Sequence, residues 1–312
     1  MDKPNRSALV MGGTGFVGRH VCEKLCREGW HVTVPTRRVA QARHIQHLPG
    51  LTTLEADVHD AATLEQLVRG HDAVIQLIAI LHGSEPAFEK VHVALPGKLA
   101  QACQATGVRR VIHVSALGVS PEGPALYQKT KARGESALAE AGLDLTVLRP
   151  SVIFGAEDSF LNLFAAMQKW LPFVPLASAQ ARFQPVWVED VASAAVAALQ
   201  QPSTIGKVYE CAGPDDMSLA EIVRFAGAAS GHRRPVFGIP AFAGRMQAWV
   251  MEQLPGTPLM SRDNLDAMKR PNVATGEHPG LLALGIVPAS IRALATSYLG
   301  SGPDKAQQRR QR

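Results

Sequence analysis

The first 150 residues alternate short runs rich in β-branched residues with helix-length amphipathic segments. The strand-like runs are SALVMG, HVTVPT, TTLEAD, DAVIQLIAI, RRVIHVSA and LTVLRP. Between them, apolar residues recur at helical spacing and predict helices at 16–28, 38–48, 61–69, 88–106 and 126–141. Strands that alternate with helices form right-handed βαβ units around one parallel sheet. The alternation therefore predicts an α/β fold with a doubly wound parallel sheet in residues 1–150.

The chain becomes less regular after Pro150. Proline-rich loops separate predicted helices at 190–200, 218–230, 241–254 and 288–299. Two strand-like segments near 183–212, FQPVWVED and KVYECAG, are expected to return to the sheet and complete it. We therefore expect residues 151–300 to form mainly a smaller substrate or partner region that is interleaved with the first domain. Residues 301–312, SGPDKAQQRRQR, predict a basic, disordered tail.

A glycine-rich turn, VMGGTGFVGRH, joins the first predicted strand to the first predicted helix. Glycine permits a sharp turn and a close approach of a pyrophosphate, and the helix N-terminus offers free N–H groups to phosphates. A plain tight turn is the alternative, but the place of the motif between a strand and a helix favours a Rossmann-type nucleotide site. The cofactor-binding residues predicted here are Gly12, Gly13, Thr14, Gly15, Phe16, Val17 and Gly18.

The second predicted strand ends in VPTRR, without the acidic residue that would hold the ribose 2′-hydroxyl of NAD. Thr36, Arg37 and Arg38 take its place, and a guanidinium can bind a 2′-phosphate bidentately. A solvated loop is the alternative reading of two arginines. The sequence therefore predicts NADP(H) in preference to NAD(H), with Arg37 as the main contact.

Tyr127 and Lys131, in LYQKTK, are four positions apart on a predicted helix and therefore share one face. The Y-x-x-x-K spacing after the fifth strand, together with the glycine-rich turn, resembles the short-chain dehydrogenase/reductase superfamily. In that superfamily the lysine favours the phenolate of the tyrosine, which moves a proton, and hydrogen-bonds the nicotinamide ribose. The resemblance implies Tyr127, Lys131 and Ser115 as catalytic residues. Ala116 occupies the second place of a serine pair that many extended members have, which puts turnover in question.

Other segments resemble the extended and atypical members of this superfamily in order along the chain. The resemblance implies adenine contacts at Asp57 and Val58, contacts to the nicotinamide ribose at Ile78 and Ala79, and a structural helix N-cap at Asp190. It also implies a loop after the sixth strand, LRPSVIFG, that wraps the nicotinamide. The residues expected to do so are Pro150, Ser151 and Val152.

Four stretches carry a narrower resemblance. VSALG, RPSVIFGAEDSFLNLF, FQPVWVEDVA and LPGTPLMSRDNLDAMKRPNV resemble bacterial relatives of the nucleotide-binding accessory subunit of mitochondrial respiratory complex I. In that family the subunit holds NADPH tightly and supports structure more than turnover. The resemblance therefore implies a link to the respiratory chain or to quinone metabolism, with a membrane protein as a partner.

Composition limits the remaining classes. Lys and Arg number 32 against 27 Asp and Glu, but only 5% of residues are aromatic and no basic stripe is visible, so we expect no nucleic-acid partner. The four cysteines form neither a C-x-x-C pair nor a metal spacing, which predicts reduced structural thiols and no metal. No signal core or spanning apolar run is present, so we expect a cytoplasmic protein, alternatively peripheral at the inner membrane.

Three functions remain open from the sequence. The nucleotide is structural or regulatory, or the chain is an active NADP(H)-dependent oxidoreductase or epimerase on a small apolar carbonyl or hydroxyl substrate, or it is a redox-sensing regulator. The aromatic residues expected to line an apolar substrate pocket are Phe160, Phe164, Trp170, Phe173 and Phe237. In the helix at 241–254 we expect Phe242, Met246, Trp249 and Val250 to pack in the core, with a surface for a membrane protein, a bilayer or a quinone tail as the alternative.

Overall fold

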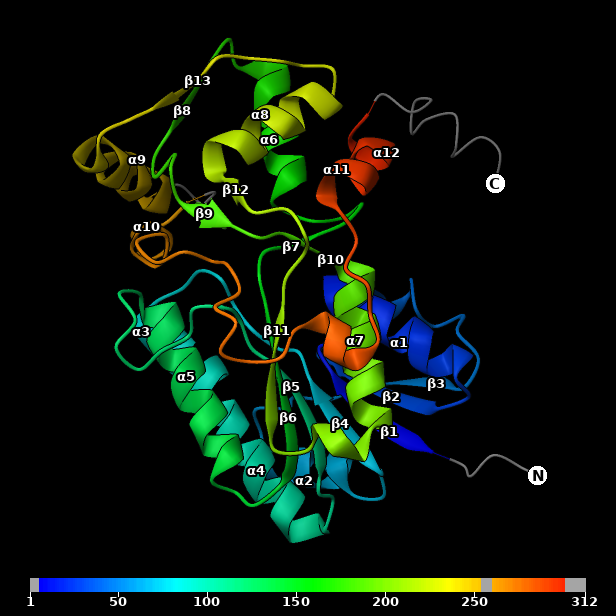
Figure 1. Cartoon of the computed structure of the whole chain (residues 1–312). Helices are drawn as coiled ribbons and strands as arrows, with labels where there is room; N and C mark the ends of the chain where they lie inside the picture. The colour runs from blue at the N-terminus through cyan, green and yellow to red at the C-terminus, as the bar shows by residue number, and fades with distance from the viewer. Residues whose placement is uncertain (1–5, 254–259, 301–312) are drawn as a thin grey trace. The chain divides into compact units, whose positions relative to one another are not determined.

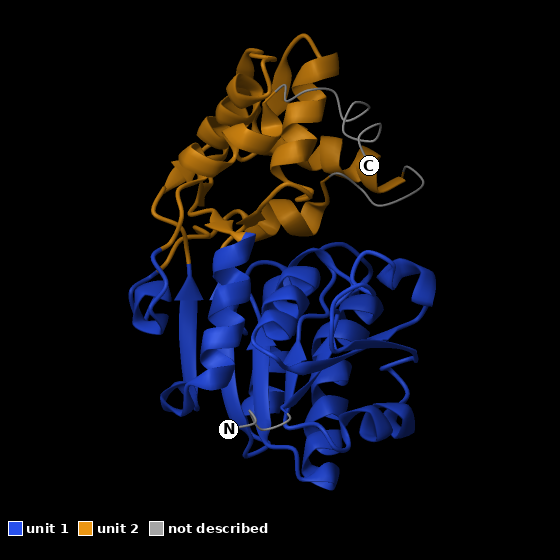
Figure 2. Ribbon diagram, turned by 90° about the vertical axis from the view of Figure 1, so that its right-hand side faces the viewer, with its two compact units in different colours: residues 1–150, 188–211, 275–287 blue, residues 151–187, 212–274, 288–312 orange. Residues whose placement is uncertain are grey.

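The computed structural model describes residues 6–253 and 260–300, so the predicted tail at 301–312 lies outside the described residues. The chain forms two compact units (Figure 2). Unit 1 comprises residues 1–150, 188–211 and 275–287, and unit 2 comprises residues 151–187, 212–274 and 288–312. Each unit therefore draws on segments that are distant in the sequence.

Unit 1 is built on a seven-stranded sheet in which all neighbouring strands are parallel. The strand order is β11-β6-β5-β4-β1-β2-β3, and this order reverses direction between β1 and β4, which is where doubly wound sheets bind ligands. The predicted fold class is therefore confirmed. The strands are β1 (Ser7–Met11), β2 (His31–Thr36), β3 (Leu51–Glu55), β4 (Ala73–Gln76), β5 (Arg110–Val114), β6 (Asp144–Pro150) and β11 (Lys207–Cys211).

Helices cover both faces of this sheet (Figure 1). On one face α2 packs on α4 and α4 on α5, and on the other face α1 packs on α7. Beneath α2 and α4, a core of buried aliphatic residues includes Leu9, Leu64, Val74, Leu99 and Val111. The helices are α1 (Phe16–Arg27), α2 (Ala61–Val68), α4 (Leu95–Thr106), α5 (Leu126–Ala139) and α7 (Val188–Gln200), with short 3₁₀ segments η3 (Pro202–Thr204) and η4 (Leu281–Leu284).

The predicted helix at 38–48 is wrong beyond its first turn. Only the 3₁₀ segment η1 (Val39–Ala42) forms, and turns follow it. The apolar residues Ala42, Ile45 and Leu48 are three apart, and the backbone N–H groups of Ile45 and Leu48 bond the carbonyls three residues back. A three-residue spacing suits 3₁₀ turns better than an α-helix, which explains the difference.

The predicted helix at 88–106 begins earlier and contains a wide turn. It consists of α3 (Glu85–Phe88), the π-helical segment η2 (Glu89–Ala94) and α4. Pro96 lies in the first turn of α4 and has no N–H to bond the carbonyl of His92, four residues back. The wide turn forms at that freed carbonyl, and π-helical turns often mark functional sites.

Unit 2 contains short strands and the helices α6 (Leu161–Trp170) and α8 (Leu219–Ala229), which pack on each other. Its core is aromatic and aliphatic, with Phe154, Phe164, Phe183 and Leu219 buried. The remaining elements are β7 (Ile153–Phe154), β8 (Val174–Leu176), β9 (Arg182–Phe183), β10 (Val186–Trp187), β12 (Met217–Ser218), β13 (Val236–Gly238), α9 (Ala241–Gln253), α10 (Arg262–Ala267), α11 (Ile291–Leu294) and α12 (Thr296–Leu299).

The segment 183–190 does not join the large sheet as expected. Val186 and Trp187 pair with β7 in a separate two-stranded sheet, whereas β11 does pair with β6. Asp190 is not a helix N-cap, because α7 begins at Val188, directly after β10. Its carboxylate lies instead in the first helical turn, where the helix dipole still favours negative charge.

One expectation about apolar residues in unit 2 is wrong. The apolar face of α9 is exposed rather than packed in the core. Of the residues expected to line an apolar pocket, Phe164 is buried and contacts Phe160, whereas Trp170, Phe173 and Phe237 are exposed. Within the described residues, no helix is both long enough and apolar enough to cross a membrane.

Candidate nucleotide site

The glycine-rich turn follows β1 at the carboxyl edge of the sheet. Gly12 has a φ of +86°, which an L side chain rarely adopts, and a Cβ on Gly18 would lie 2.1 Å from the carbonyl oxygen of Gly12. The turn is therefore too tight for larger residues. α1 begins at Phe16 with Gly15 as its cap, without a side-chain cap and without an acidic residue in its first turn. Its N–H groups and the positive end of its dipole are left for a phosphate.

The end of β4 lies directly beside this turn. A Cβ on Gly12 would be 3.2 Å from the backbone nitrogen of Ile78. Gln76 is buried and fixes the segment that follows, because its Oε1 accepts from the backbone N–H of Ile78 at 2.6 Å and its Nε2 donates to the Ile78 carbonyl at 3.3 Å. Ile78 and Ala79 are thereby held next to the glycine-rich turn. Gln76 is a positioning residue that the sequence did not reveal.

At the end of β2, Thr36 is buried and its side chain orders the residues after it. The backbone N–H of Arg38 donates to Thr36 Oγ1 at 3.4 Å, and that hydroxyl donates to the Arg38 carbonyl at 3.2 Å. Arg37 and Arg38 are exposed, and neither forms an ion pair in the part of the chain that the structure describes. Two guanidinium groups are thus available at the strand end.

Asp57 and Val58 follow β3 on the neighbouring loop. Asp57 is exposed and accepts from the backbone N–H of His59 at 2.9 Å, while Val58 is buried in the core. The pKa of His59 is lowered by burial first and by the nearby charges of Lys90, Lys98 and Arg37, with Asp57 opposing them. Arg37 is therefore close to this loop, as a site for the adenosine half of a dinucleotide requires.

Lys131 lies in α5 with only 2% of its surface exposed. Its ammonium group donates to the carbonyl of Val114, the last residue of β5, at 2.9 Å. Burial lowers the pKa of Lys131 to about 8, and the charge of Glu135 opposes this shift. Glu135 is itself held by two hydrogen bonds from Arg149, at 3.1 and 2.5 Å. Lys131 is therefore a buried amine whose pKa lies close to neutral pH, and such perturbed groups are typical of binding and catalytic sites.

Tyr127 lies one turn before Lys131, as the Y-x-x-x-K spacing predicted. Its ring contacts the rings of Phe88 and His92 edge to face, with centroids at 6.5 and 5.4 Å. Tyr127 is half-buried, and its burial beside these rings raises its pKa to about 12. The surroundings therefore favour the neutral phenol, which donates a hydrogen bond, over the phenolate, which takes up a proton.

His92 belongs to this group although the sequence gave no sign of it. It is buried in the π-helical segment, where its Nε2 accepts from the backbone N–H of Ile80 and its Nδ1 lies 3.0 Å from the hydroxyl of Thr130. Since Nε2 accepts, Nδ1 carries the proton of the neutral ring. Burial and the charge of Lys131 lower the pKa of His92 to about 3, so the ring stays neutral. His92 thus joins α5 to the loop after β4.

Ser115 and Ala116 follow β5. The backbone N–H of Ser115 donates to the carbonyl of Leu148, but its buried hydroxyl has no partner in the described part of the chain. Pro150 ends β6, and its carbonyl accepts from the backbone N–H of Leu117 at 2.8 Å, which fixes this loop. An unpaired buried hydroxyl is unfavourable by about 1–3 kcal/mol, and a ligand group could satisfy it.

Ser151 and Val152 belong to unit 2 and are described within it. Asn272 holds both, because its Oδ1 accepts from the Ser151 hydroxyl at 2.7 Å and from the Val152 N–H at 3.0 Å. The backbone of Asn272 also pairs with Arg182 and Gln184. Asn272 lies in LPGTPLMSRDNLDAMKRPNV, one of the four stretches of the narrower resemblance, so the motif has a structural role in ordering this loop.

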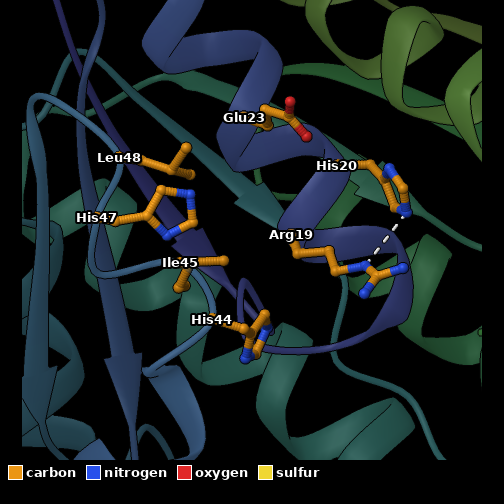
Figure 3. Close-up of a pocket in the computed structure, with 7 residues that line it drawn as sticks. All are labelled: Arg19, His20, Glu23, His44, Ile45, His47 and Leu48. Atoms are coloured by element: carbon orange, nitrogen blue, oxygen red, sulfur yellow. Dashed lines mark hydrogen bonds between the residues drawn. The ribbon is translucent and has the colours of Figure 1, made fainter. Parts of the chain in front are cut away.

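A small pocket in unit 1 lies between α1 and the turns after η1 (Figure 3). His20 forms part of its wall: it accepts from Arg19 at 3.2 Å and lies 2.5 Å from Glu189 of α7. Lys24 is 2.8 Å from the same carboxylate, so this network fastens α1 to α7. The pocket contains none of the predicted site residues. It is lined by Arg19, His20, Glu23, His44, Ile45, His47 and Leu48.

The residues of unit 1 fit a nicotinamide dinucleotide. A tight glycine turn with a free helix N-terminus suits the pyrophosphate, a buried ammonium group suits a ribose hydroxyl, and the unpaired Ser115 hydroxyl suits a polar group of the ligand. Such a set of features at the carboxyl edge of a parallel sheet defines a dinucleotide-binding protein.

Residues 12–202 match the family model described as NAD(P)H-binding. This match spans more than half of the chain, so the chain belongs to the NAD(P)H-binding family. A relative in Mus musculus, NADH dehydrogenase [ubiquinone] 1 alpha subcomplex subunit 9, mitochondrial, is 32% identical over 299 residues, which cover 94% of this chain and 79% of that protein. The chain therefore falls in the family of this complex I subunit, as the sequence motifs predicted.

Two solved structures share the fold. A NADPH-dependent quinone oxidoreductase complexed with NADPH from Escherichia coli has a TM-score of 0.76 at 20% identity, covering 94% of this chain and 99% of that one. A nucleoside-diphosphate-sugar epimerase from Staphylococcus aureus has a TM-score of 0.75 at 17% identity, covering 93% and 99%. The predicted Rossmann-type architecture is thus found in both reductases and epimerases.

Proposed function

We propose that the chain holds NADP(H) as a tightly retained ligand with a mainly structural role, as an accessory subunit-like protein. The observation that carries this proposal is the environment of Tyr127 and Lys131. Burial against the rings of Phe88 and His92 raises the pKa of Tyr127 to about 12, and the ammonium group of Lys131 is buried against the Val114 carbonyl. Efficient proton transfer needs a pKa near the working pH, whereas binding needs fixed donors. The pair therefore suits binding better than turnover.

In this proposal each predicted residue has a part in binding. Gly12, Gly15 and Gly18 with the N-terminus of α1 hold the pyrophosphate, and Lys131 with Tyr127 donates to the nicotinamide ribose. Asp57 and Val58 contact the adenine. Ile78, Ala79 and Pro150 complete the nicotinamide end within unit 1.

A preference for NADP(H) rests on Arg37 and Arg38. Both guanidinium groups follow a strand end that lacks an acidic residue, and charge-assisted hydrogen bonds contribute about 1.5–3 kcal/mol each. We expect Arg37→Ala to lower the ratio of NADPH to NADH affinity roughly ten-fold or more. Arg43→Ala is the matched control, since Arg43 is an exposed arginine of the same segment. An unchanged ratio in Arg37→Ala would disprove the assignment.

The experiment that tests retention measures how fast bound nucleotide leaves the purified protein. Excess labelled NADPH is added and the released nucleotide is identified. Retention over hours supports a structural ligand, whereas exchange within seconds contradicts it. Release of NADH would contradict the role of Arg37 and leave retention intact.

The second candidate is an active NADP(H)-dependent oxidoreductase or epimerase on a small apolar substrate. The unpaired buried hydroxyl of Ser115 favours it, because such a group could orient a substrate carbonyl. The fold shared with a quinone oxidoreductase also agrees with it. A bound nicotinamide would supply the hydride, and Tyr127 would supply or accept the proton. Turnover of a quinone that is lost in Tyr127→Phe and Ser115→Ala would establish this function.

The cellular setting is part of the proposal. The relatives that are complex I subunits point to a partner in the respiratory chain, and we place the protein in the cytoplasm at the inner membrane. Co-purification of respiratory complex I with the tagged chain from solubilised membranes would support this setting. Its absence, under conditions where the nucleotide stays bound, would contradict it.

A further inference from the structure

α9 presents its large apolar side chains to solvent and its small ones to the protein. Gly244 and Ala248 are buried, and a Cβ on Gly244 would lie 2.6 Å from the Cβ of Ala177. On the other side, Phe242, Met246, Trp249 and Val250 form an apolar stripe with exposed fractions of 75%, 63%, 51% and 48%. These positions are i, i+4, i+7 and i+8, which is one face of a helix. The stripe is therefore a continuous apolar surface.

α9 is fixed in this orientation by α10. Arg245 pairs with Asp266 at 2.9 Å, and Arg262 pairs with Glu252 at 2.8 Å. The small residues pack with Ala177 and Leu265, so rotating the stripe inward would place large side chains where only Gly244 and Ala248 fit. The exposure of the stripe thus follows from the packing on both sides of the helix.

The apolar stripe is not isolated. Trp170 and Leu171 at the end of α6, Phe173, and Phe237 in β13 are also exposed, and Phe173 contacts Phe237 with ring centroids 6.4 Å apart. β8 and β13 pair with each other, and α9 follows β13 after Ile239 and Pro240 (Figure 1). The large apolar side chains that are exposed in the described part of unit 2 come from α9, from β13 and from the end of α6 with the residues after it, and together we call them the apolar surface of unit 2.

The unpaired charges around the apolar surface are positive, because the nearby carboxylates of Glu252 and Asp266 are already paired with Arg262 and Arg245. The surface comes from two segments, 159–188 and 222–251, and neither contains an aspartate or a glutamate. Lys169 lies over the ring of Trp170 at 5.8 Å, and Arg233 and Arg234 are exposed just before β13. None of these three cations forms an ion pair with a carboxylate among the residues described. A partner that carries negative charge beside an apolar layer would match this pattern.

We propose that the apolar surface of unit 2 binds an anionic lipid bilayer, with the stripe of α9 at the level of the headgroups and upper acyl chains. Aromatic and aliphatic side chains flanked by Lys and Arg are the composition of helices that lie in a membrane interface. A second copy of the chain fits less well. A two-fold interface would gather the unpaired cations of both copies, because the carboxylates of Glu252 and Asp266 are already paired within each copy.

The test is co-sedimentation of the purified full chain with vesicles of phosphatidylcholine alone or mixed with phosphatidylglycerol. We expect binding to the mixed vesicles that weakens between about 0.1 M and about 1 M salt, where the Debye length falls from about 10 Å to about 3 Å. Trp249→Glu should weaken binding by roughly ten-fold or more, because a charge is strongly disfavoured among acyl chains. Removing the charge of Arg233 with Arg233→Gln should weaken it by roughly five-fold.

The matched control is Val287→Glu, which adds the same charge at an exposed valine of unit 1. Equal binding by wild type and Trp249→Glu, with both proteins folded by circular dichroism, would overturn the proposal. Self-association that Trp249→Glu abolishes, without vesicle binding, would assign the surface to a second copy instead. Binding only to native membranes that is lost after protease treatment would assign it to a membrane protein. None of these readouts depends on the nucleotide, so the proposed function is tested separately.

Discussion

α5 and α9 depart from the usual helix pattern in opposite directions. α5 buries polar side chains, among them Gln128, Thr130, Lys131 and Glu135. α9 exposes apolar ones and buries only Gly244 and Ala248. An ordinary surface helix buries a continuous apolar stripe and exposes its charges. Each helix therefore gives up some stability for an arrangement that folding alone does not require.

The difference between them indicates two kinds of ligand. The buried polar groups of α5 are held in fixed positions by Val114, His92 and Arg149, so they can recognise a small molecule with defined hydrogen-bonding groups. The exposed apolar side chains of α9 offer no hydrogen-bonding groups, so they suit an extended apolar layer. We therefore assign a small-molecule site to α5 and a docking surface to α9.

The variant Lys131→Met tests most directly whether α5 buries its polar side chains for binding. If Lys131 is buried for binding, its loss should weaken NADPH binding roughly 100-fold, through the loss of charge-assisted hydrogen bonds. It should also raise the free energy of unfolding by on the order of 1–3 kcal/mol, because a buried charge is replaced by an apolar group. Calorimetric titration and urea unfolding measure the two effects. Lys129→Met, on the exposed side of α5, should change neither.

The packing side of α9 gives the next largest effect. Ala248→Leu should lower the free energy of unfolding by about 1–3 kcal/mol, since Ala248 is fully buried where α9 packs with Ala177 and Leu265. Trp249→Ser, one residue further along, should change it by no more than about 0.5 kcal/mol. The reverse order in urea unfolding would show that α9 packs with its large residues inward and would remove the apolar surface.

The stability of Lys131→Met relative to wild type should also depend on pH. The pKa of Lys131 is about 8 in the folded chain against 10.5 in the unfolded one, so between these values the folded state binds fewer protons. The unfavourable burial of the charge is therefore complete below pH 8 and is relieved as the pH rises toward 10.5.

The stability advantage of Lys131→Met over wild type should accordingly shrink above pH 8. Taking the difference between the two proteins cancels the titration of the buried cysteines, whose pKa values are also shifted. Urea unfolding at several pH values between 7 and 10 measures it. An advantage that is constant with pH would mean that the pKa of Lys131 is the same in the folded and the unfolded chain.

The sheet and the glycine-rich turn were predictable because their signals are local. Strand periodicity and the spacing of Gly12, Gly15 and Gly18 depend on neighbouring residues only, and so does the end of α4 at the left-handed Gly107. The direction of α9 was not predictable, because a stripe at Phe242, Met246, Trp249 and Val250 fits a core or a surface equally well. The direction of α9 is decided by Ala177, about seventy residues earlier in the chain, because it leaves room only for glycine at position 244.

His92 and Asn272 were missed for a similar reason. His92 gains its place from Pro96, which frees its carbonyl, and from Gly134, whose missing Cβ would lie 2.0 Å from that carbonyl oxygen. Asn272 acts on Ser151 and Val152, more than a hundred residues earlier in the chain. The roles proposed for Tyr127, Ser115 and the binding residues remain predictions that the variants described here address.

The smallest expected effect separates binding from catalysis at Tyr127. If the neutral phenol only donates one hydrogen bond to the nucleotide, Tyr127→Phe should weaken NADPH binding by roughly five-fold, since such a bond contributes about 1 kcal/mol. The variant should still retain the nucleotide through purification. His92→Phe, which keeps a ring beside Tyr127 but loses the bonds to Ile80 and Thr130, serves as the comparison within the same group of rings. A larger loss in His92→Phe than in Tyr127→Phe would place the binding role in the arrangement of α5 rather than in the phenol itself.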